Sequence, residues 1–407
     1  MPGALSHLRV LDLSRILAGP WATQILADLG AEVIKVERPR VGDDTRGWGP
    51  PYLKDTAGHP TTDSAYYLCT NRNKKSITLD FTQPEGQTLV RELAKQADIV
   101  VENFKVGGLK QYGLDYESLR EIQPRLIYCS VTGFGQTGPY AERAGYDFLI
   151  QGMGGLMSVT GRPDGEPGAG PMKVGVALTD IMTGLYSSTA ILAALAYRDR
   201  TGVGQHIDMA LLDVQVACLA NQSMNYLYGG KAPGRLGNAH PNVVPYQDFP
   251  TADGYMILAL GNDGQFVKLC DVMGHPEWAQ DERFKGNAGR VQHRDVLVPM
   301  LRDVTVTRTT AQWIATLESA SVPCGPINDV AGVFADPQVV ARGAKITMPH
   351  PVAGDIPLVA NPIHLSETPP EYRSAPPLLG QHTREVCRSW LGLDDAAIDA
   401  LAAKGVV

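Results

Sequence analysis

Short apolar runs alternate with amphipathic stretches through the first third of the chain. The run at 8–14 precedes a stretch of helical spacing at 21–31, and a second apolar run follows at 32–37. The succession recurs, with strands predicted at 76–81, 98–104 and 125–135 and helices at 84–96 and 116–122. Repeated β–α–β units of this kind build a parallel sheet with helices on its faces. The pattern therefore predicts a doubly wound α/β domain.

The pattern changes after this region. A long helix rich in alanine and leucine is predicted over 176–200, and the glycine- and proline-rich stretch 225–241 is interpreted as a linker. A second, smaller α/β unit begins with the apolar run 254–261 and extends to about 324–329. Loops and short strands follow, and a closing helix is expected near 382–392.

Composition and charge narrow the class of protein. With 407 residues, two domains are the natural expectation, and a net charge of -7 argues against a nucleic-acid partner. The six cysteines are scattered without a CxxC pair or zinc spacing, which predicts reduced thiols and no metal site. No secretory signal and no uninterrupted apolar stretch of about 18 residues is found, so we expect a cytoplasmic protein without a membrane span.

Several common site motifs are missing. The turn between Ser14 and Pro20 has the position of a phosphate-binding loop, but it lacks GxGxxG. The stretch 160–171 is rich in glycine but holds three prolines and no GK[ST], which favours a surface loop. His240 is the most notable of nine mostly isolated histidines, and capping of its own loop is a simpler role for it than catalysis.

Asp180 follows a strongly apolar run and lies at the start of the long predicted helix. From composition alone, helix N-capping explains it slightly better than catalysis does. A partly buried carboxylate at a helix N-terminus also suits covalent catalysis, because the helix dipole would keep it ionised and dry surroundings would sharpen its nucleophilicity. Both interpretations stay open on the residues alone.

Eight segments in order resemble the family III CoA transferases, from about residue 6 to the C-terminus. They are LAGPWATQILADLGAEVIKVERPRVGDDTR, NRNKKSITLD, ADIVVENF, SVTGFGQTGPYAERAGYD, the Asp180 segment, RTGVGQHIDMALLD, PCGPINDV and PLLGQHTREV. The resemblance implies a Rossmann-like large domain formed by both chain ends, a small central α/β domain and an interlocked ring homodimer. The corresponding bounds here are 1–224 for the first part of the large domain, 225–330 for linker and small domain, and 331–407 for the return segment.

The resemblance also assigns roles to individual residues. Asp180 matches the catalytic aspartate, Arg38 an arginine that contacts the CoA nucleotide, and Leu17 and Ala18 backbone that lines the CoA site. Four residues match positions beside the adenine and phosphates: Leu79, Asp80, Asn103 and Phe104. From the residues alone, Arg38 would equally form a surface ion pair with Asp43 or Asp44, and Asn103 and Phe104 a turn at a strand end.

Departures from the family pattern bear on the reaction. Ala144 and Gln111 stand where the formyl-CoA transferases have a lysine and an arginine, which argues against formyl or oxalyl specificity. Tyr146 stands where the racemases carry a histidine base, and a phenol with a pKa near 10 is a poor base at neutral pH. These residues favour transfer, with a 2-methylacyl-CoA racemase or a non-catalytic acyl-CoA-binding protein as alternatives.

The family mechanism implies that Asp180 carries the acyl group and then CoA, with no permanently bound cofactor. Backbone amides of the short loop Gly261, Asn262, Asp263 and Gly264 are expected to stabilise tetrahedral oxyanions. The segment RLGNAHPNVVPYQDFPTADGYMILALGNDGQF resembles the succinyl-CoA:glutarate branch, which implies succinyl-CoA as donor and a dicarboxylate acceptor. Four candidate cations for the second carboxylate stay unranked: Arg15, Arg46, Arg72 and Arg235.

Overall fold

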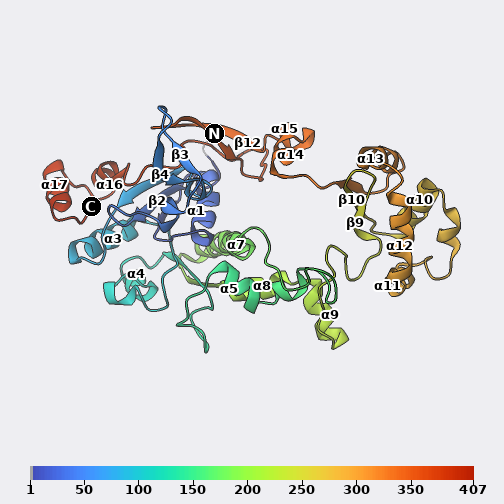
Figure 1. Cartoon of the computed structure of the whole chain (residues 1–407). Coiled ribbons are helices and arrows are strands. Elements are labelled where there is room, and N and C mark those ends of the chain that lie inside the picture. The colour runs from blue at the N-terminus through green and yellow to red at the C-terminus, as the bar shows by residue number, and fades with distance from the viewer. Residues whose placement is uncertain (1–2) are drawn as a thin grey trace. The chain divides into compact units, whose positions relative to one another are not determined.

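The computed structural model describes residues 3–407, which form two compact units (Figure 1). The first unit contains the residues up to Leu156 together with Val174–Ser223 and Gln338–Val407, and the second contains Met157–Lys173 and Met224–Pro337. Residues 160–171 form an irregular and largely exposed segment, as predicted. The sequence alone gave no reason to separate this segment from the unit that precedes it.

A six-stranded, fully parallel sheet is the centre of the first unit. Its strand order is β5-β2-β1-β6-β7-β8. The strands are β1 (Arg9–Asp12), β2 (Glu32–Glu37), β5 (Lys74–Thr78), β6 (Ile99–Glu102), β7 (Ile127–Thr132) and β8 (His206–Ala210). Five of these strands were predicted, and they are observed. The predicted α/β class is confirmed as well. The sixth strand, β8, was missed.

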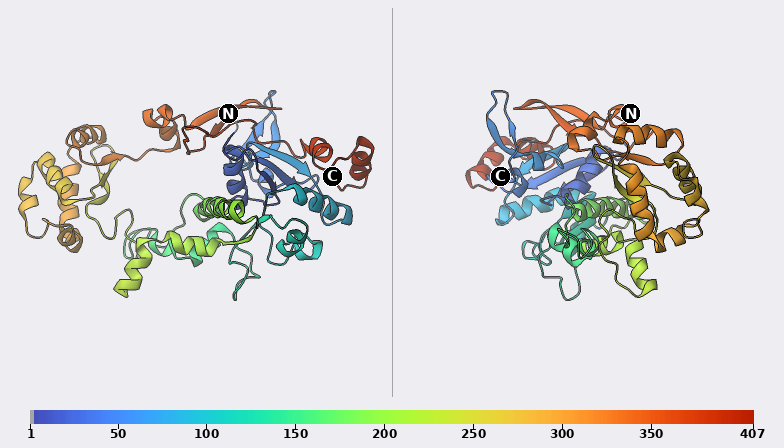
Figure 2. Two further views of the ribbon diagram at one scale, coloured as in Figure 1. Left: turned by 180° about the vertical axis from the view of Figure 1, so that it is seen from behind. Right: turned by 45° about the vertical axis from the view of Figure 1, so that its right-hand side comes forward.

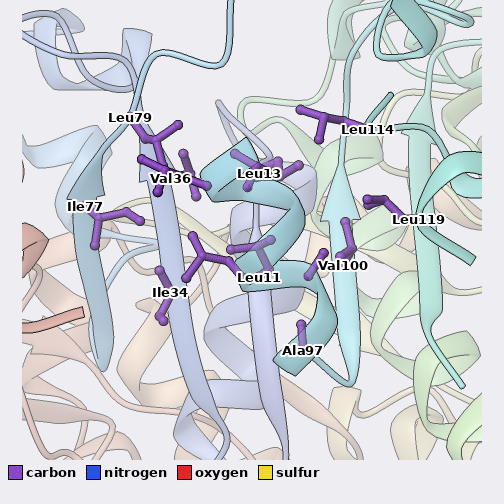
Figure 3. Packing of buried hydrophobic residues seen from close by; sticks show 14 of the residues in the cluster. Leu11, Leu13, Ile34, Val36, Ile77, Leu79, Ala97, Val100, Leu114 and Leu119 are labelled. Atoms are coloured by element: carbon purple, nitrogen blue, oxygen red, sulfur yellow. The ribbon is translucent and has the colours of Figure 1, made fainter. Parts of the chain in front are cut away.

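Successive side chains of a strand point to opposite faces of the sheet, and here both faces carry apolar side chains. Helices therefore cover both faces. Val10 belongs to the cluster shared with α1, α5, α7 and α8, whereas Leu11 belongs to the cluster shared with α3, α4 and α16 (Figure 3). The helices are α1 (Ala18–Asp28), α3 (Pro84–Gln96), α4 (Tyr116–Ile122), α5 (Asp147–Met153), α7 (Leu178–Thr201), α8 (Leu211–Cys218), α16 (Thr383–Ser389) and α17 (Asp395–Ala403). The doubly wound arrangement is therefore observed.

Helix α7 is 24 residues long and fulfils the prediction of a long apolar helix. Among residues 3–407 it is the one helix whose length and composition would allow it to cross a bilayer. Buried core helices meet the same criteria, and α7 packs against α1 and strands β7 and β8. That packing accounts for the apolar side chains on the buried face of α7, whereas other apolar side chains of the helix remain exposed.

The residues after Gln338 return to the first unit and bond to its early elements, helix α1 and strand β5. They form the hairpin of β12 (Lys345–His350) and β13 (Gly354–Val359). A separate hairpin in the early part of the chain pairs β3 (Tyr52–Lys54) with β4 (Pro60–Ser64). Further along, the His382 amide donates to the Ser76 carbonyl at 2.9 Å, and the Glu371 amide donates to the Asp28 carbonyl at 2.8 Å. These bonds join residues some 300 positions apart.

Most of the second unit is drawn in yellow to orange in Figure 2. It is built on an antiparallel sheet of order β11-β10-β9. Its strands are β9 (Tyr246–Pro250), β10 (Tyr255–Ala259) and β11 (Cys324–Pro326), and its main helices are α10 (Asp263–Met273), α11 (Asn287–Gln292), α12 (Arg294–Thr305), α13 (Thr310–Ser319) and α14 (Val330–Ala335). Buried Phe249, Phe266 and Trp313 pack in one core between sheet and helices. The apolar run at 254–261 forms β10, as predicted.

The linker interpretation of 225–241 is wrong for its first residues. Helix α9 spans Asn221–Gly229, and irregular structure begins only at Gly230, which adopts a left-handed φ of 71°. The glycine and proline content that suggested a linker begins at the end of this helix. Local helical propensity before Gly229 therefore prevails over the composition of the whole stretch.

Candidate active site

A cavity of about 570 Å³ opens at the carboxyl ends of the parallel strands. Residues that follow β1, β2, β5, β6 and β7 line it, together with the first turn of α7. In an open parallel sheet, ligands bind at this edge because the connecting loops leave a crevice there. Every residue assigned to the CoA site or to the reaction within the first unit lines this one cavity: Leu17, Ala18, Arg38, Leu79, Asp80, Asn103, Phe104, Tyr146 and Asp180.

The loop after β1 is fixed from behind by side chains of neighbouring strands. Ile16 has a φ of 73°, a left-handed conformation that is costly for a β-branched residue. Asn103 accepts a hydrogen bond from the Arg15 amide at 2.9 Å and donates one to the Arg15 carbonyl at 2.6 Å. Asp43 accepts from the Ile16 amide at 3.3 Å. The strained turn is thus held in place before any ligand arrives.

A buried ionic network supports this loop. Lys35 pairs with Asp43 at 2.8 Å and donates to the Ser14 carbonyl at 2.8 Å, while Lys74 pairs with Asp12 at 3.1 Å. Burial raises the pKa of Asp43, but the Lys35 ammonium outweighs it and the pKa falls to about 2. Asp43 is therefore ionised and accepts hydrogen bonds at any physiological pH.

Aromatic rings form one wall of the cavity. Phe81 meets Phe104 edge to face at 5.6 Å and Tyr112 at 5.7 Å between ring centroids. The Arg15 guanidinium lies over the Phe104 ring at 5.2 Å and pairs with Asp44 at 3.0 Å. Such a surface suits a flat heteroaromatic ring. Sequence reasoning found Phe104, but the packing of Phe81 and Tyr112 beside it had no local signal.

Arg38 is exposed and lines the cavity. The alternative of a surface ion pair with Asp43 or Asp44 is wrong, because these carboxylates pair with Lys35 and Arg15 instead. Burial raises the pKa of Asp80, but hydrogen bonds from Thr82 and Gln83, together with the Arg38 charge, outweigh it and lower the pKa. Arg38 remains available to an anionic ligand.

Asp180 is the third residue of α7 and does not cap it. The cap is supplied by Asp147 of α5, whose Oδ1 accepts from the Thr179 amide at 2.8 Å and from the Asp180 amide at 3.3 Å. Gln151 holds the other oxygen of Asp147 at 2.6 Å. The N-cap interpretation of Asp180 is therefore wrong, and its side chain is left to face the cavity.

Burial, and then the neighbouring Asp147 carboxylate, raise the pKa of Asp180 to about 7. The expectation that the helix N-terminus alone would keep this group fully ionised is wrong, because desolvation and like charge outweigh it. A carboxylate that is half-protonated near neutral pH is poorly solvated and correspondingly more nucleophilic. The site can hold a reactive carboxylate beside a ligand-sized cavity.

Tyr146 immediately precedes α5, at its N-cap position, and is 63% exposed, so its side chain is accessible from the cavity. Its segment is held against the end of β7 by close backbone packing, since a Cβ on Gly133 would lie 2.5 Å from the Gly145 Cα. Ala144 and Gln111, the two departures from the family pattern, line the same cavity. So do Lys105 and Arg143, which the sequence did not single out.

The loop Gly261, Asn262, Asp263 and Gly264 belongs to the second unit, at the start of α10. The Gly261 amide already donates to the Gln265 side chain at 2.7 Å, and Asn262 caps the helix through the Gln265 amide at 3.0 Å. If this loop stabilises an oxyanion, the amides available in the first turn of α10 are those of Asp263 and Gly264. The oxyanion role of the loop stays a prediction.

His240 accepts a hydrogen bond from the Asn242 amide at 3.1 Å and packs on Tyr246, as expected for a loop-capping residue. Within residues 3–407 all six cysteines are unpaired, and no group of histidine, cysteine and carboxylate side chains has the arrangement of a metal site. The cavity itself presents the Asp180 carboxylate, several cations and an aromatic wall.

Comparison with known proteins agrees with this site. The family described as CoA-transferase family III matches residues 5–383. A succinate–glutarate CoA-transferase of Agrobacterium fabrum is 54% identical over 94% of this chain and 94% of its own. The succinyl-CoA:glutarate CoA-transferase of Mus musculus is 46% identical over 99% of this chain and 90% of its own. The crystal structure of a CAIB/BAIF family protein from Brucella suis, 53% identical, superposes with a TM-score of 0.83 over 96% of this chain and 100% of that one. The chain belongs to CoA-transferase family III, and it is an enzyme of that family.

Proposed function

We propose that this enzyme transfers CoA between succinyl-CoA and glutarate or a closely related dicarboxylate. The observation that carries the proposal is a desolvated Asp180 at the wall of a cavity that also offers an aromatic wall and cations. The substrates are those named for the Agrobacterium and mouse relatives, which match this chain over nearly its full length.

The reaction is proposed to begin when the Asp180 carboxylate attacks the donor thioester carbonyl. The carbon–sulfur bond breaks, which gives an aspartyl–acyl anhydride and CoA thiolate. The thiolate then attacks the aspartyl carbonyl and releases the donor acid, leaving an aspartyl–CoA thioester. The acceptor carboxylate attacks that thioester and frees the thiolate again, and the thiolate takes the acceptor acyl group from the second anhydride. Asp180 is regenerated as a carboxylate.

Other residues of the cavity support these steps in the proposal. Arg38 and the aromatic wall of Phe81, Phe104 and Tyr112 bind the CoA nucleotide through charge and stacking. The exposed Tyr146 hydroxyl donates a hydrogen bond to an anhydride or thioester oxygen. A phenol donates well at neutral pH but does not abstract an α-proton, which favours transfer over racemisation.

The test is a panel of acids offered with succinyl-CoA, with the CoA products identified by mass spectrometry. We expect glutaryl-CoA to form, with free succinate released in equal amount. In parallel, a 2-methylacyl-CoA is incubated in deuterated water. Deuterium at its α-carbon without CoA exchange would assign a racemase instead. If neither glutaryl-CoA nor the deuterated thioester forms, the proposal is refuted.

The rate is expected to depend on the ionisation of Asp180. Because its pKa is raised to about 7, kcat/KM should rise with pH through about 7 and be low on the acid side, where the carboxylate is protonated. Asp147→Asn removes the nearby charge and preserves the cap shape, so the acid limb should move to lower pH. Burial is the larger cause and remains, so part of the shift should persist.

The control for this profile is Asp303→Asn, which removes an exposed carboxylate of the second unit. Its profile should match that of the unchanged enzyme. An acid limb that stays in place in Asp147→Asn would contradict the assignment of the limb to Asp180.

Loss of the hydrogen bonds by which Asn103 holds the loop after β1 should weaken CoA binding. Asn103→Ala removes both hydrogen bonds to Arg15, so the strained turn at Ile16 is free to relax away from the cavity. We expect the dissociation constant for CoA to rise about 10-fold, as for the loss of hydrogen bonds that fix a partly buried loop. Titration calorimetry with CoA measures it, and unchanged affinity would show that the loop needs no such support.

We also propose that two chains form a homodimer, interlocked as in the family pattern. The outward face of α7 carries large apolar side chains that are about 40% exposed, and α5 adds Phe148 at 59%. Apolar side chains gathered in this way on a soluble protein mark an association surface. The exposed residues of α7 are Leu185, Tyr186, Leu192 and Tyr197. Sedimentation velocity at micromolar concentration should give twice the chain mass, and a monomer would refute the dimer.

A further inference from the structure

A dicarboxylate substrate brings a second carboxylate that takes no part in the chemistry. That group is ionised at neutral pH and loses water on entering the cavity, so it needs a cation or several hydrogen-bond donors. Five basic side chains line the cavity: Arg15, Lys35, Arg38, Lys105 and Arg143. The question is which of them is placed to receive this carboxylate.

The four cations considered from the sequence are already engaged. Arg46 is buried between Glu37 at 2.7 Å and Asp63 at 2.6 Å, and Arg72 is buried against Asp28 at 2.5 Å. Arg235 pairs with Asp164 within the second unit. Arg15 lines the cavity, but it pairs with Asp44 at 3.0 Å and lies over the Phe104 ring.

Of the cavity cations, Lys35 is also excluded, because it is fully buried against Asp43. Arg38, Lys105 and Arg143 form no ion pair with any carboxylate of residues 3–407 at distances up to 4.0 Å. Three candidates therefore remain, and the strand order separates them.

Arg38 follows β2 and Lys105 follows β6, whereas Arg143 lies in the loop after β7. In the order β5-β2-β1-β6-β7-β8, strands β7 and β8 form the edge away from β2. Asp180 is joined to the loop after β7 rather than to β2 or β6, because its amide donates to Asp147 Oδ1 at 3.3 Å and Asp147 is four residues after Arg143. Arg143 also precedes Gly145 and Tyr146, whose segment packs on Gly133 at the end of β7. Arg143 thus shares the reaction end of the cavity.

The local contacts of Arg143 hold its guanidinium without neutralising it. The group lies over the Tyr140 ring at 4.5 Å and the Phe134 ring at 5.0 Å, and it donates to the Met153 sulfur at 3.8 Å. Stacking uses the face of a guanidinium and leaves N–H groups along its edge, which match a carboxylate in a two-point hydrogen bond. The charge of Arg143 is preserved for a ligand.

We propose that Arg143 binds the free carboxylate of the dicarboxylyl substrate and thereby sets the preference for dicarboxylates. The inference rests on the proposed function, in which Asp180 receives the acyl group. It makes Arg143 a specificity-determining residue and assigns Arg38 and Lys105 to the part of the cavity that receives CoA. The roles are separable, because only Arg143 should distinguish acyl groups by their distal charge.

The test compares glutaryl-CoA with pentanoyl-CoA, which have acyl chains of equal length and differ in the distal carboxylate. The readout is the rate at which each forms the CoA adduct on Asp180, followed by mass spectrometry of the intact protein. In Arg143→Gln we expect the rate with glutaryl-CoA at low concentration to fall about 10- to 100-fold, as for the loss of a charged hydrogen-bond pair. The rate with pentanoyl-CoA should not change. Arg143→Lys should recover part of the loss, because it restores the charge without the two-point geometry.

Arg38→Gln is the matched comparison, because it removes an arginine from the same cavity and should slow both thioesters alike. Arg342→Gln, an exposed arginine outside the cavity lining, should alter neither. An equal effect of Arg143→Gln on the two thioesters, or no effect on either, would overturn the inference. If the unchanged enzyme forms no adduct from either thioester, the proposed function fails, and this result is distinct from a failure of the Arg143 assignment.

Discussion

Replacement of Asp180 by alanine should lower the rate of CoA exchange by at least about 10⁴-fold, as expected when the only covalent nucleophile is removed. The binding of CoA should be nearly intact, because the aromatic wall and Arg38 do not depend on the Asp180 side chain. The rate is measured as exchange between succinyl-CoA and labelled succinate, and binding by calorimetry. Asp180→Asn, which keeps the shape but not the nucleophile, should be equally inactive.

Two results would speak against this assignment. Exchange that survives within about tenfold in Asp180→Ala would mean that another group carries the acyl chain. A parallel loss of CoA binding would point to a collapsed site. Treatment with hydroxylamine after incubation with acyl-CoA should trap an adduct on the unchanged enzyme and none on the variant.

Loss of Arg46 should have the largest effect on stability. Its guanidinium is buried and donates to Glu37 at 2.7 and 2.8 Å, to Asp63 at 2.6 Å and to the Tyr67 hydroxyl at 2.6 Å. Arg46→Met leaves two buried carboxylates without their cation, which we expect to cost about 3 to 5 kcal/mol of unfolding free energy. Urea denaturation followed by circular dichroism measures it.

The double variant Glu37→Gln with Arg46→Met separates charge from packing. Neutralising Glu37 removes one of the two stranded charges, so the double variant should be more stable than Arg46→Met alone. If the two variants are equally destabilised, the loss comes from the shape of the side chain and the ionic account is wrong.

The sequence predicted the parallel sheet well where its strands are apolar and buried on both faces. Strand β2 and helices α3 and α4 have the predicted bounds because apolar runs and turn residues agree there. Strand β8 was missed because His206 and Asp208 interrupt the apolar pattern, as is usual for an edge strand with one exposed face. The residues that fix its place in the sheet are on β7, more than 70 positions earlier.

The site was predicted as a set of residues but not as an electrostatic arrangement. Asp180 was found from the family pattern, yet its pKa is raised first by burial and then by Asp147, a residue 33 positions away with no local signal of that role. The support of the loop at Ile16 by Asn103 likewise joins two strands. Arg143 had no signal, because an exposed arginine in a loop resembles any solvated cation until the cavity is seen.

The return of the chain after Gln338 bears on how the protein is made. Helix α1 and strand β5 of the first unit bond to Glu371 and His382, and the buried Arg46 donates to the Pro377 carbonyl at 3.2 Å. While the ribosome is still adding the second unit, those partners do not yet exist, so the first unit waits with an incomplete core and exposed backbone groups. The second unit is contiguous apart from residues 157–173 and can fold during this wait. A chaperone that protects the nascent first unit should therefore matter more for the yield of active enzyme than one that acts after release.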